Sequence, residues 1–278
     1  MIASTLTAFR SARYLSIPLM IGCIIVLFWF CVTFLAPLMA PYDPLDMVGR
    51  RLQAPSWAHW LGTDALGRDV LTRTLHGARH SLPIAVTVVV IAVAIGATLG
   101  AISGFVGGLV GSAIMRLVDV TLSFPPMLLA MAVAASLGPG LENATIAMVI
   151  VWWPVYARLM RAQVLEIRER EHVEAAIAAG ASRPRVLLKH IVPLCWTPVL
   201  ISATMDLGQV ILLAASLSFI GLGATPPTPE WGSMISDGAS QFYSWWVALG
   251  PGLAILTVVL GFNFIGDGLH DYFDPKSK

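Results

Sequence analysis

Residues 82–106 read LPIAVTVVVIAVAIGATLGAISGFV, a run that contains no charged side chain. A helix needs about 20 such apolar residues to cross the hydrocarbon core of a bilayer with every backbone group bonded internally. Five further runs have a comparable length and composition, so the sequence predicts six transmembrane helices, over residues 17–40, 82–106, 113–137, 143–160, 196–221 and 245–265. The fold class that follows is an all-α membrane helix bundle.

The composition of the whole chain agrees with a lipid environment. Of its 278 residues, 57% are hydrophobic and 12% are charged, and the mean hydropathy is +0.78. A water-soluble domain carries roughly 25% charged residues, so most of this surface is expected to face lipid. The first apolar run is longer than the roughly 7–15 residues of a signal-peptide core, so we expect a retained span. A net charge of +1 gives no reason to expect a nucleic acid partner.

The distribution of lysine and arginine predicts the orientation in the membrane, because cytoplasmic loops carry an excess of both residues. With the N-terminus inside, twelve of these residues fall on the cytoplasmic side and five on the other. We therefore expect both termini in the cytoplasm, with a cytoplasmic N-terminal segment over residues 1–16 and a transmembrane domain over residues 17–278. This domain is predicted to carry an external loop over residues 41–80 and a cytoplasmic loop over residues 161–193.

Proline and glycine indicate where the helices bend and where they pack closely. A double proline at residues 125–126 lies in the third predicted span and Pro154 in the fourth, so a kink or a break is expected at each. Gly96, Gly100 and Gly104 are spaced four residues apart and form a small-residue face on the second span. Another helix, of this chain or of a partner, can pack closely on such a face.

The stretch between the fourth and fifth runs, residues 158–190, is the most charged and most helix-prone polar part of the chain. Its centre, residues 171–182, reads EHVEAAIAAGAS, and alanine and glutamate are strong helix formers. Gly180 is suited to end a first helix, and Ser182 followed by Pro184 to begin another. The pattern predicts a short helix at the cytoplasmic face that exposes alanines and fits a groove on another protein. The alternative is a solvated loop whose positive charges only set the topology.

Parts of this loop resemble a known motif. Glu174-Ala175-Ala176-x-x-x-Gly180, followed after nine residues by His190-Ile191-Val192-Pro193, is similar to the EAA loop of ABC importer permeases. The histidine at the start of the second block is typical of the dipeptide, oligopeptide and nickel permease branch of that family. Four further segments resemble blocks of the same branch in the same order, over residues 61–70, 107–119, 217–232 and 266–275.

This resemblance implies a permease subunit that translocates di- or oligopeptides, or related small solutes, across the bacterial cytoplasmic (inner) membrane by alternating access. It also implies a second homologous permease, two ATPase subunits that use ATP and magnesium, and an extracytoplasmic substrate-binding protein. The chain itself is then expected to bind no cofactor. The contact with the ATPase is expected to involve Glu174, Ala175, Ala176, Gly180, Ala181 and Ser182. A nickel-chelate importer is the alternative, and a passive channel is a remote one.

Enzymatic and metal chemistry find little support in the sequence. Residues 62–69 superficially match a phosphate-binding loop, but Arg68 replaces its lysine and Asp69 its hydroxyl residue. An intramembrane enzyme needs paired catalytic groups within the spans, and one acidic residue alone, Asp206, lies deep enough. His76 and His80 are four residues apart but precede the apolar core of their span. We therefore predict a chain that is not an enzyme and has no catalytic, cofactor-binding or metal site.

Asp206 lies inside the predicted fifth span. Because an ionisable group in hydrocarbon is costly, its default interpretation is functional, as a residue that faces a water-filled translocation pathway. The alternative is a carboxylate whose hydrogen bonds are satisfied at a helix interface. In the first case it would suit a cationic or amino-group-bearing solute.

Overall fold

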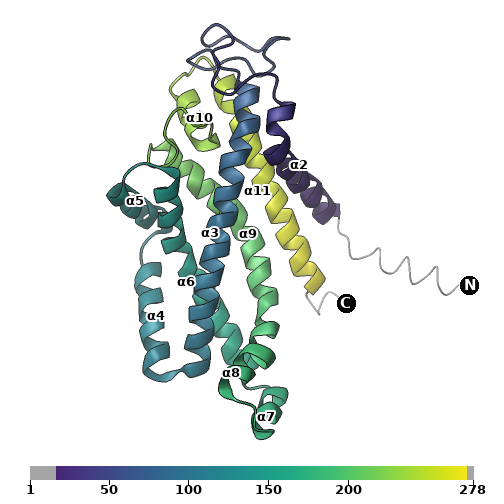
Figure 1. Ribbon diagram of the computed structural model, residues 1–278, viewed down its shortest axis with the longest axis vertical. Coiled ribbons are helices and arrows are strands. Elements are labelled where there is room, and N and C mark those ends of the chain that lie inside the picture. Colours follow the sequence, from purple (N-terminus) through teal and green to yellow (C-terminus); the bar gives the residue numbers. More distant parts are fainter. Residues whose placement is uncertain (1–16, 274–278) are drawn as a thin grey trace, which may run out of the picture.

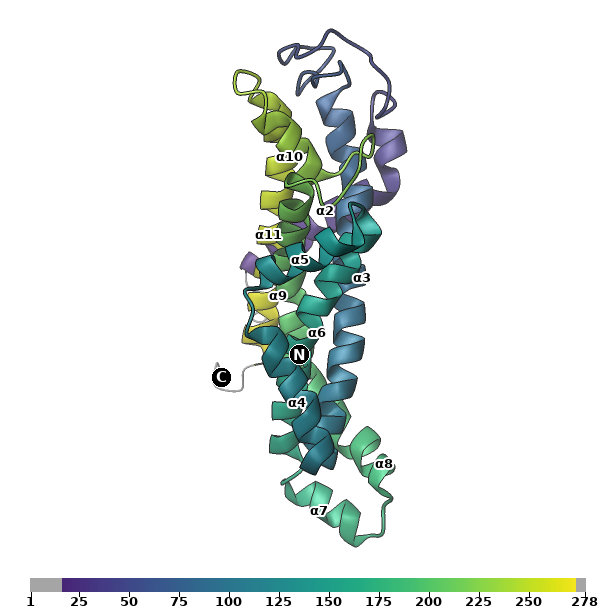
Figure 2. The same ribbon diagram turned by 90° about the vertical axis from the view of Figure 1, so that its left-hand side faces the viewer.

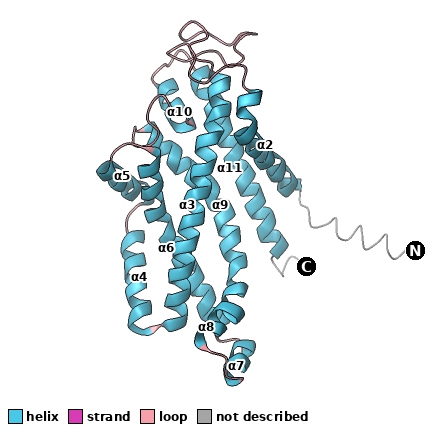
Figure 3. Ribbon diagram, viewed as in Figure 1, coloured by secondary structure: helices cyan, strands magenta, loops and turns pink. Residues whose placement is uncertain are grey.

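The computed structural model describes residues 17–273, and the predicted cytoplasmic N-terminal segment, residues 1–16, lies outside them. The described residues form helices joined by loops, with no β-sheet among them (Figures 1 and 3). The helices are α2 (Ile17–Met39), α3 (Val70–Val106), α4 (Gly108–Leu122), α5 (Pro126–Leu137), α6 (Leu141–Ile167), α7 (Glu171–Ala178), α8 (Arg183–Val186), the π-helical turn η2 (Leu187–Ile191), α9 (Val192–Phe219), α10 (Trp231–Ala239) and α11 (Trp246–Phe273).

Within residues 17–273, four helical runs are long and apolar enough to cross a membrane, namely Ile17–Met39, Val70–Val106, Arg183–Phe219 and Trp246–Phe273. The bent pair formed by α4 and α5 gives a fifth. The remaining predicted span corresponds to α6, a helix of 27 residues that begins with Glu142 in its first turn and carries Arg158 and Arg161 farther along. The predicted all-α membrane helix bundle is confirmed, and the number six stays a prediction.

The third predicted span is broken, as its double proline indicates. α4 and α5 bend by 91° across the short connection between Leu122 and Pro126. Pro126 lies in the first turn of α5, where its missing N–H leaves no carbonyl without a partner. The fourth span differs, because α6 continues through the buried Pro154 without interruption.

α3 begins at Val70, well before the predicted start of the second span at residue 82. Asp69 caps the helix, because its side chain accepts a hydrogen bond from the Thr72 amide at 2.8 Å. At 1.5 Å per residue, the 37 residues of α3 extend over about 55 Å, well beyond the roughly 30 Å of a hydrocarbon core. The predicted external loop of residues 41–80 therefore ends in helix, and the first turns of α3 are expected to stand outside the hydrocarbon.

The small-residue face of α3 packs against α6 of the same chain. A Cβ atom at Gly96 would overlap the carbonyl oxygen of Trp153, and one at Gly100 would overlap the carbonyl oxygen of Ala157. A Cβ atom at Gly104 would lie 2.9 Å from the nearest side-chain atom of α6. The two backbones approach too closely for any side chain here, so the partner of this face is a helix within the subunit.

The two ends of the bundle differ in structure. Residues 40–69, called the cap below, lie above the upper ends of α2 and α3 (Figure 1), and α10 lies near the same end. α7 and α8 project at the opposite end (Figures 1 and 2). The long helices α3, α6 and α9 run between these ends, so continuous backbone connects them.

Candidate functional site

Residues 171–186, called the hook below, consist of α7, a tight turn and α8. The turn closes α7 in a Schellman arrangement: the Gly180 amide donates to the Ile177 carbonyl at 2.9 Å, and the Ala181 amide donates to the Ala176 carbonyl at 3.1 Å. Gly180 has a φ of +83°, in the left-handed region that favours glycine. The predicted short helix, its glycine stop and the second helix are therefore confirmed.

The six residues predicted to contact an ATPase lie along the hook. Val173 on α7 and Val186 on α8 are each 1% exposed and belong to the buried core. The predicted contact residues face outward more often than inward: Glu174, Ala175, Gly180 and Ser182 are exposed, and Ala176 and Ala181 are half-buried. Most of these side chains are small, so the surface of another protein can approach the backbone of α7 closely.

The hook is connected to the bundle by continuous helix. α8 passes through the π-helical turn directly into α9, and Ile191 at the end of that turn is 0% exposed. On the other side of the hook, Arg168 follows the last residue of α6 and donates from Nη1 to the Gly104 carbonyl of α3 at 3.1 Å. A force on the hook therefore acts on α9 through its backbone and on the joined ends of α6 and α3.

Asp206 forms a contact between two helices. The hydroxyl of Tyr156 on α6 donates to Oδ2 of Asp206 on α9 at 2.7 Å, and Ser202 Oγ lies 3.4 Å from the same oxygen. Tyr156 is 0% exposed, whereas Asp206 is half-buried. This geometry agrees with the alternative interpretation, in which the hydrogen bonds of the Asp206 carboxylate are satisfied at a helix interface. A direct role of Asp206 in a translocation pathway stays a prediction.

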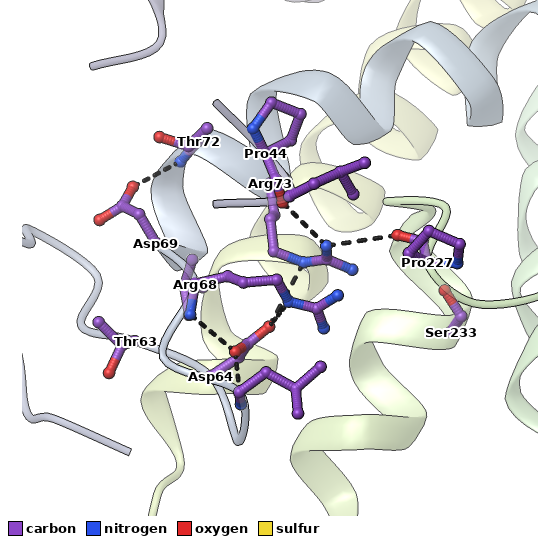
Figure 4. Close-up of polar contacts among 12 residues, drawn as sticks. Pro44, Thr63, Asp64, Arg68, Asp69, Thr72, Arg73, Pro227 and Ser233 are labelled. Atoms are coloured by element: carbon purple, nitrogen blue, oxygen red, sulfur yellow. Dashed lines mark hydrogen bonds and ion pairs between the residues drawn. The ribbon is translucent and has the colours of Figure 1, made fainter. Parts of the chain in front are cut away.

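A network of buried charges attaches the cap to α3 (Figure 4). At its centre, Asp64 accepts two backbone amides on Oδ1 and accepts Arg68 Nε on Oδ2 at 2.6 Å. Arg73 Nε lies 3.5 Å from the same Oδ2. Nη1 of Arg73 donates to the carbonyls of Pro44, at 3.0 Å, and of Pro227, at 3.5 Å. Arg73 thereby joins α3 to the cap and to the loop that follows α9.

Two further carboxylates complete this arrangement. Besides capping α3, Asp69 places Oδ1 2.9 Å from Nδ1 of His59, and both side chains are buried. Asp237 on α10 lies near the same arginines as Asp64. Burial raises the pKa of the Asp237 carboxyl above its ordinary value, and the positive charges of Arg73 and Arg68 oppose that shift.

α10 is fastened to α3 by a second set of contacts. Glu230 is 2% exposed and caps α10, because its carboxylate accepts the amides of Gly232 and Ser233, each at 3.0 Å. It also accepts the hydroxyl of Ser81 at 3.2 Å, and the indole of Trp231 donates to a carbonyl of α3 at 2.9 Å. The roles of the buried charges around Asp64 and of Glu230 were not predicted from the sequence. The signals in the sequence are the i, i+4 spacing of Asp64 and Arg68 before α3 and the acidic residue that precedes α10.

Comparison with known proteins shows the family of this chain. Residues 96–278 match the family described as the binding-protein-dependent transport system inner membrane component. The chain belongs to this family. The chain is similar to the dipeptide transport system permease protein DppC of Escherichia coli K12, with 48% identity over 267 residues that cover 93% of this chain and 89% of that protein. DppC of Alkalihalophilus pseudofirmus is 44% identical over 260 residues, with 93% and 86% covered.

A relative with a different named solute has a comparable similarity. The glutathione transport system permease protein GsiD of Shigella flexneri is 44% identical over 262 residues, which cover 93% of this chain and 86% of that protein. Among solved structures, an inward-facing conformation of the MetNI methionine ABC transporter has a TM-score of 0.60 and 18% identity, and covers 73% of this chain and 97% of that chain. At this identity the structural match shows the fold alone.

Membership of this family makes the chain a multi-pass membrane protein and a subunit of a transport system. Its named relatives are permeases, so the chain is a permease subunit rather than an enzyme in its own right. Within residues 17–273, no group of three or more His, Cys, Asp or Glu residues is placed to hold a metal ion.

Proposed function

We propose that this chain is the transmembrane permease subunit of an ATP-driven ABC importer that translocates di- or oligopeptides, or related small solutes, across the bacterial cytoplasmic membrane. The observation that carries the proposal is the hook, an exposed short helix at one end of a bundle from a family of binding-protein-dependent transport components. Relatives that are 44% and 48% identical over most of the chain are named for dipeptide transport.

The hook is the proposed contact with a cytoplasmic ATPase. Glu174, Ala175 and Gly180 present a narrow exposed ridge, and Ser182 extends it to the start of α8. Small side chains lose little conformational entropy on docking, so a ridge of this kind can seat firmly in a cleft. Hydrolysis of ATP, with magnesium, would take place in two separate ATPase subunits.

The helical connections of the hook supply a route for movement. When an ATPase moves the hook, the displacement passes from α8 through the π-helical turn into α9 along continuous helix. The bond between Tyr156 and Asp206 then couples α9 to α6 farther along the bundle. In this proposal Asp206 joins α9 to α6, and a direct contact between Asp206 and the solute is not required.

Alternating access requires more than one subunit in this proposal. A second homologous permease would face this chain across the pathway, both termini would lie in the cytoplasm, and a substrate-binding protein would deliver solute at the opposite end. Transporters with a central site expose it in turn to the two sides by moving such halves against each other. The cap and α10 would then form part of the extracytoplasmic entrance.

Peptides are the proposed solutes because the relatives with high coverage are named for dipeptide and glutathione transport. A nickel chelate is the alternative solute, since the resemblance in the sequence extends to nickel permeases. A passive channel is an alternative mechanism, which would need neither an ATPase nor a hook.

The test is ATP hydrolysis and uptake by the complete transporter, reconstituted in liposomes with its binding protein. The binding protein is presented with dipeptides, longer peptides or a nickel–histidine chelate in separate assays. We expect peptides to stimulate both activities and the nickel chelate to stimulate neither. Uptake by liposomes that lack the ATPase subunits would instead indicate a channel, and a chain that never co-purifies with an ATPase would refute the importer.

A further inference from the structure

A pocket of about 460 Å³ lies where the cap, α3 and the loop after α9 meet. Three prolines contribute to its walls, and one side of it is basic; these lining residues are Pro44, Pro227 and Pro229, and His76, Arg79 and His80. Arg73, just before the basic group on α3, binds the carbonyls of two of these prolines. The pocket is therefore a preformed feature whose walls are held by the buried charge network.

The basic side chains of the pocket have unused hydrogen-bonding capacity. Arg79 is exposed, and neither it nor the half-buried His80 takes part in an ion pair or side-chain hydrogen bond within residues 17–273. Nδ1 of His76 lies 3.0 Å from the Thr72 carbonyl, which can only accept, so Nδ1 is the donor. In the neutral ring the other nitrogen of His76 therefore carries no proton and can only accept a hydrogen bond.

No carboxylate within residues 17–273 forms an ion pair with Arg79 or His80. The described residues that line the pocket include no aspartate or glutamate. Glu230 uses its oxygens on two backbone amides and on Ser81, and Asp64 is held by Arg68 and Arg73. The pocket thus keeps at least the positive charge of Arg79, and a negative group from outside the chain would complement it.

The cap beside the pocket exposes large apolar side chains. Trp57 is 97% exposed, Trp60 69% and Met47 69%, and Leu45 of the same segment lines the pocket. Large exposed apolar side chains are common in interaction sites, and tryptophan and arginine are enriched in protein interfaces. Because the cap lies above the upper ends of the helices (Figure 1), a soluble protein is a better partner for it than lipid.

We propose that this pocket receives a carboxylate side chain of the extracytoplasmic substrate-binding protein, with the exposed aromatic side chains of the cap around the contact. The inference rests on the proposed function, since it requires an importer with such a binding protein. The guanidinium of Arg79 can offer two parallel N–H donors to one carboxylate, and His80 can add a single donor. The contact would set the orientation in which the binding protein releases its solute over the entrance.

The test measures ATPase stimulation by increasing concentrations of the binding protein that activates the wild-type transporter, assembled in lipid nanodiscs. Arg79→Glu reverses the charge of the pocket, and Arg79→Gln removes it. Arg51→Glu is the matched control, because Arg51 is an exposed arginine of the cap that does not line the pocket. We expect Arg79→Glu to raise the half-maximal concentration about tenfold, a loss in the range of interfacial charge pairs, with the rate at saturation unchanged.

Two further results would support the inference. Arg79→Gln should raise the half-maximal concentration less than Arg79→Glu and should weaken its dependence on NaCl, because one screened charge pair has been removed. Single exchanges of exposed acidic residues of the binding protein to lysine should include one that restores the affinity of the Arg79→Glu transporter. Arg51→Glu should leave the half-maximal concentration close to that of the wild type.

Four outcomes would overturn the inference. The half-maximal concentration could be unchanged in Arg79→Glu, or it could change only in nanodiscs that contain anionic lipid, which would assign the pocket to a lipid headgroup. Less of the second permease could co-purify with the variant, which would assign the pocket to the contact between the two permeases. The variant could also alter only the preference for free over amidated peptides, which would assign the pocket to the solute. A wild-type transporter that no binding protein stimulates would instead refute the proposed function itself.

Discussion

Gly180 combines a backbone angle that favours glycine with an open surrounding. Its φ is +83°, and a Cβ atom built there would meet nothing within 4 Å. A β-branched residue in this conformation costs about 2 kcal/mol, which corresponds to roughly thirty-fold in the equilibrium between the native and a distorted hook. We expect Gly180→Val to lower peptide-stimulated ATPase activity strongly while the amount of subunit in the membrane stays at the wild-type level, as measured by immunoblot of membranes.

Two control variants test whether the position or the size of the backbone strain matters: one places the strain elsewhere, and the other reduces it at residue 180. Gly221 also has a positive φ, +85°, and open space around it, but it lies at the other end of α9, so Gly221→Val should leave coupling largely intact. Asparagine tolerates the left-handed region, so Gly180→Asn should retain more activity than Gly180→Val. Loss of membrane insertion in Gly180→Val would contradict a role confined to coupling.

Tyr156 and Asp206 test whether the carboxylate within α9 is structural. Tyr156→Phe removes the hydroxyl that donates to Asp206 at 2.7 Å and should destabilise the purified transporter by about 1–3 kcal/mol, because a partly buried carboxylate loses its donor. Asp206→Asn keeps an acceptor oxygen for Tyr156 and should cost less. Thermal unfolding in detergent measures both. A changed half-saturating peptide concentration in Asp206→Asn, with unchanged thermal stability, would instead favour a contact with solute.

At the scale of the elements, a buried ion pair helps to attach the cap to α3, whereas the ion pair between α4 and α6 is exposed. The Arg68–Asp64 and Arg158–Asp119 pairs both have an N–O distance of 2.6 Å, but their side-chain exposures are 9% and 6% in the first and 57% and 65% in the second. Removing one partner of a buried pair leaves an unpaired charge and costs about 3–5 kcal/mol, whereas an exposed pair contributes less than about 1 kcal/mol. Asp64→Ala should therefore destabilise the transporter far more than Asp119→Ala.

Limited proteolysis can locate this effect in the cap. If Asp64 holds the cap to α3, Asp64→Ala should expose residues 40–69 to cleavage before the helices unfold, and Asp119→Ala should not. Equal losses of thermal stability in the two variants would show that burial of the pair has no influence.

For the whole molecule, the orientation predicted from lysine and arginine has a direct test. Cys23 and Cys31 are exposed and would be replaced by alanine, while Cys195 is buried and can stay. A membrane-impermeant maleimide should then label Trp57→Cys, at a cap position that is 97% exposed, in intact cells. Ala178→Cys, on the exposed surface of α7, should react only after the membrane is permeabilised. The reverse pattern would invert the proposed topology.

Much of the architecture follows from local features of the sequence. Apolar runs of sufficient length require helices in a bilayer, because no other solvent is available to bond their backbone groups. The double proline before α5 imposes a break wherever the neighbouring helices lie. Gly180 ends α7 through hydrogen bonds to carbonyls at most five residues away, so the hook is also a local structure. These elements could be predicted because each depends on residues close to one another in sequence.

The tertiary structure decided the features that depend on distant partners. Arg73 contacts Pro227, 154 positions away, and Tyr156 binds Asp206, 50 positions away. Periodicity and composition report only on neighbours in sequence, so they predicted neither the attachment of the cap to α3 nor the partner of Asp206. The polar first turns of α3 resemble a loop in the sequence, but they are helical: Asp69 caps them, Arg73 bonds to the cap and Ser81 to Glu230. The same packing brings Pro44 and Pro227 to the face of α3 that carries His76, Arg79 and His80.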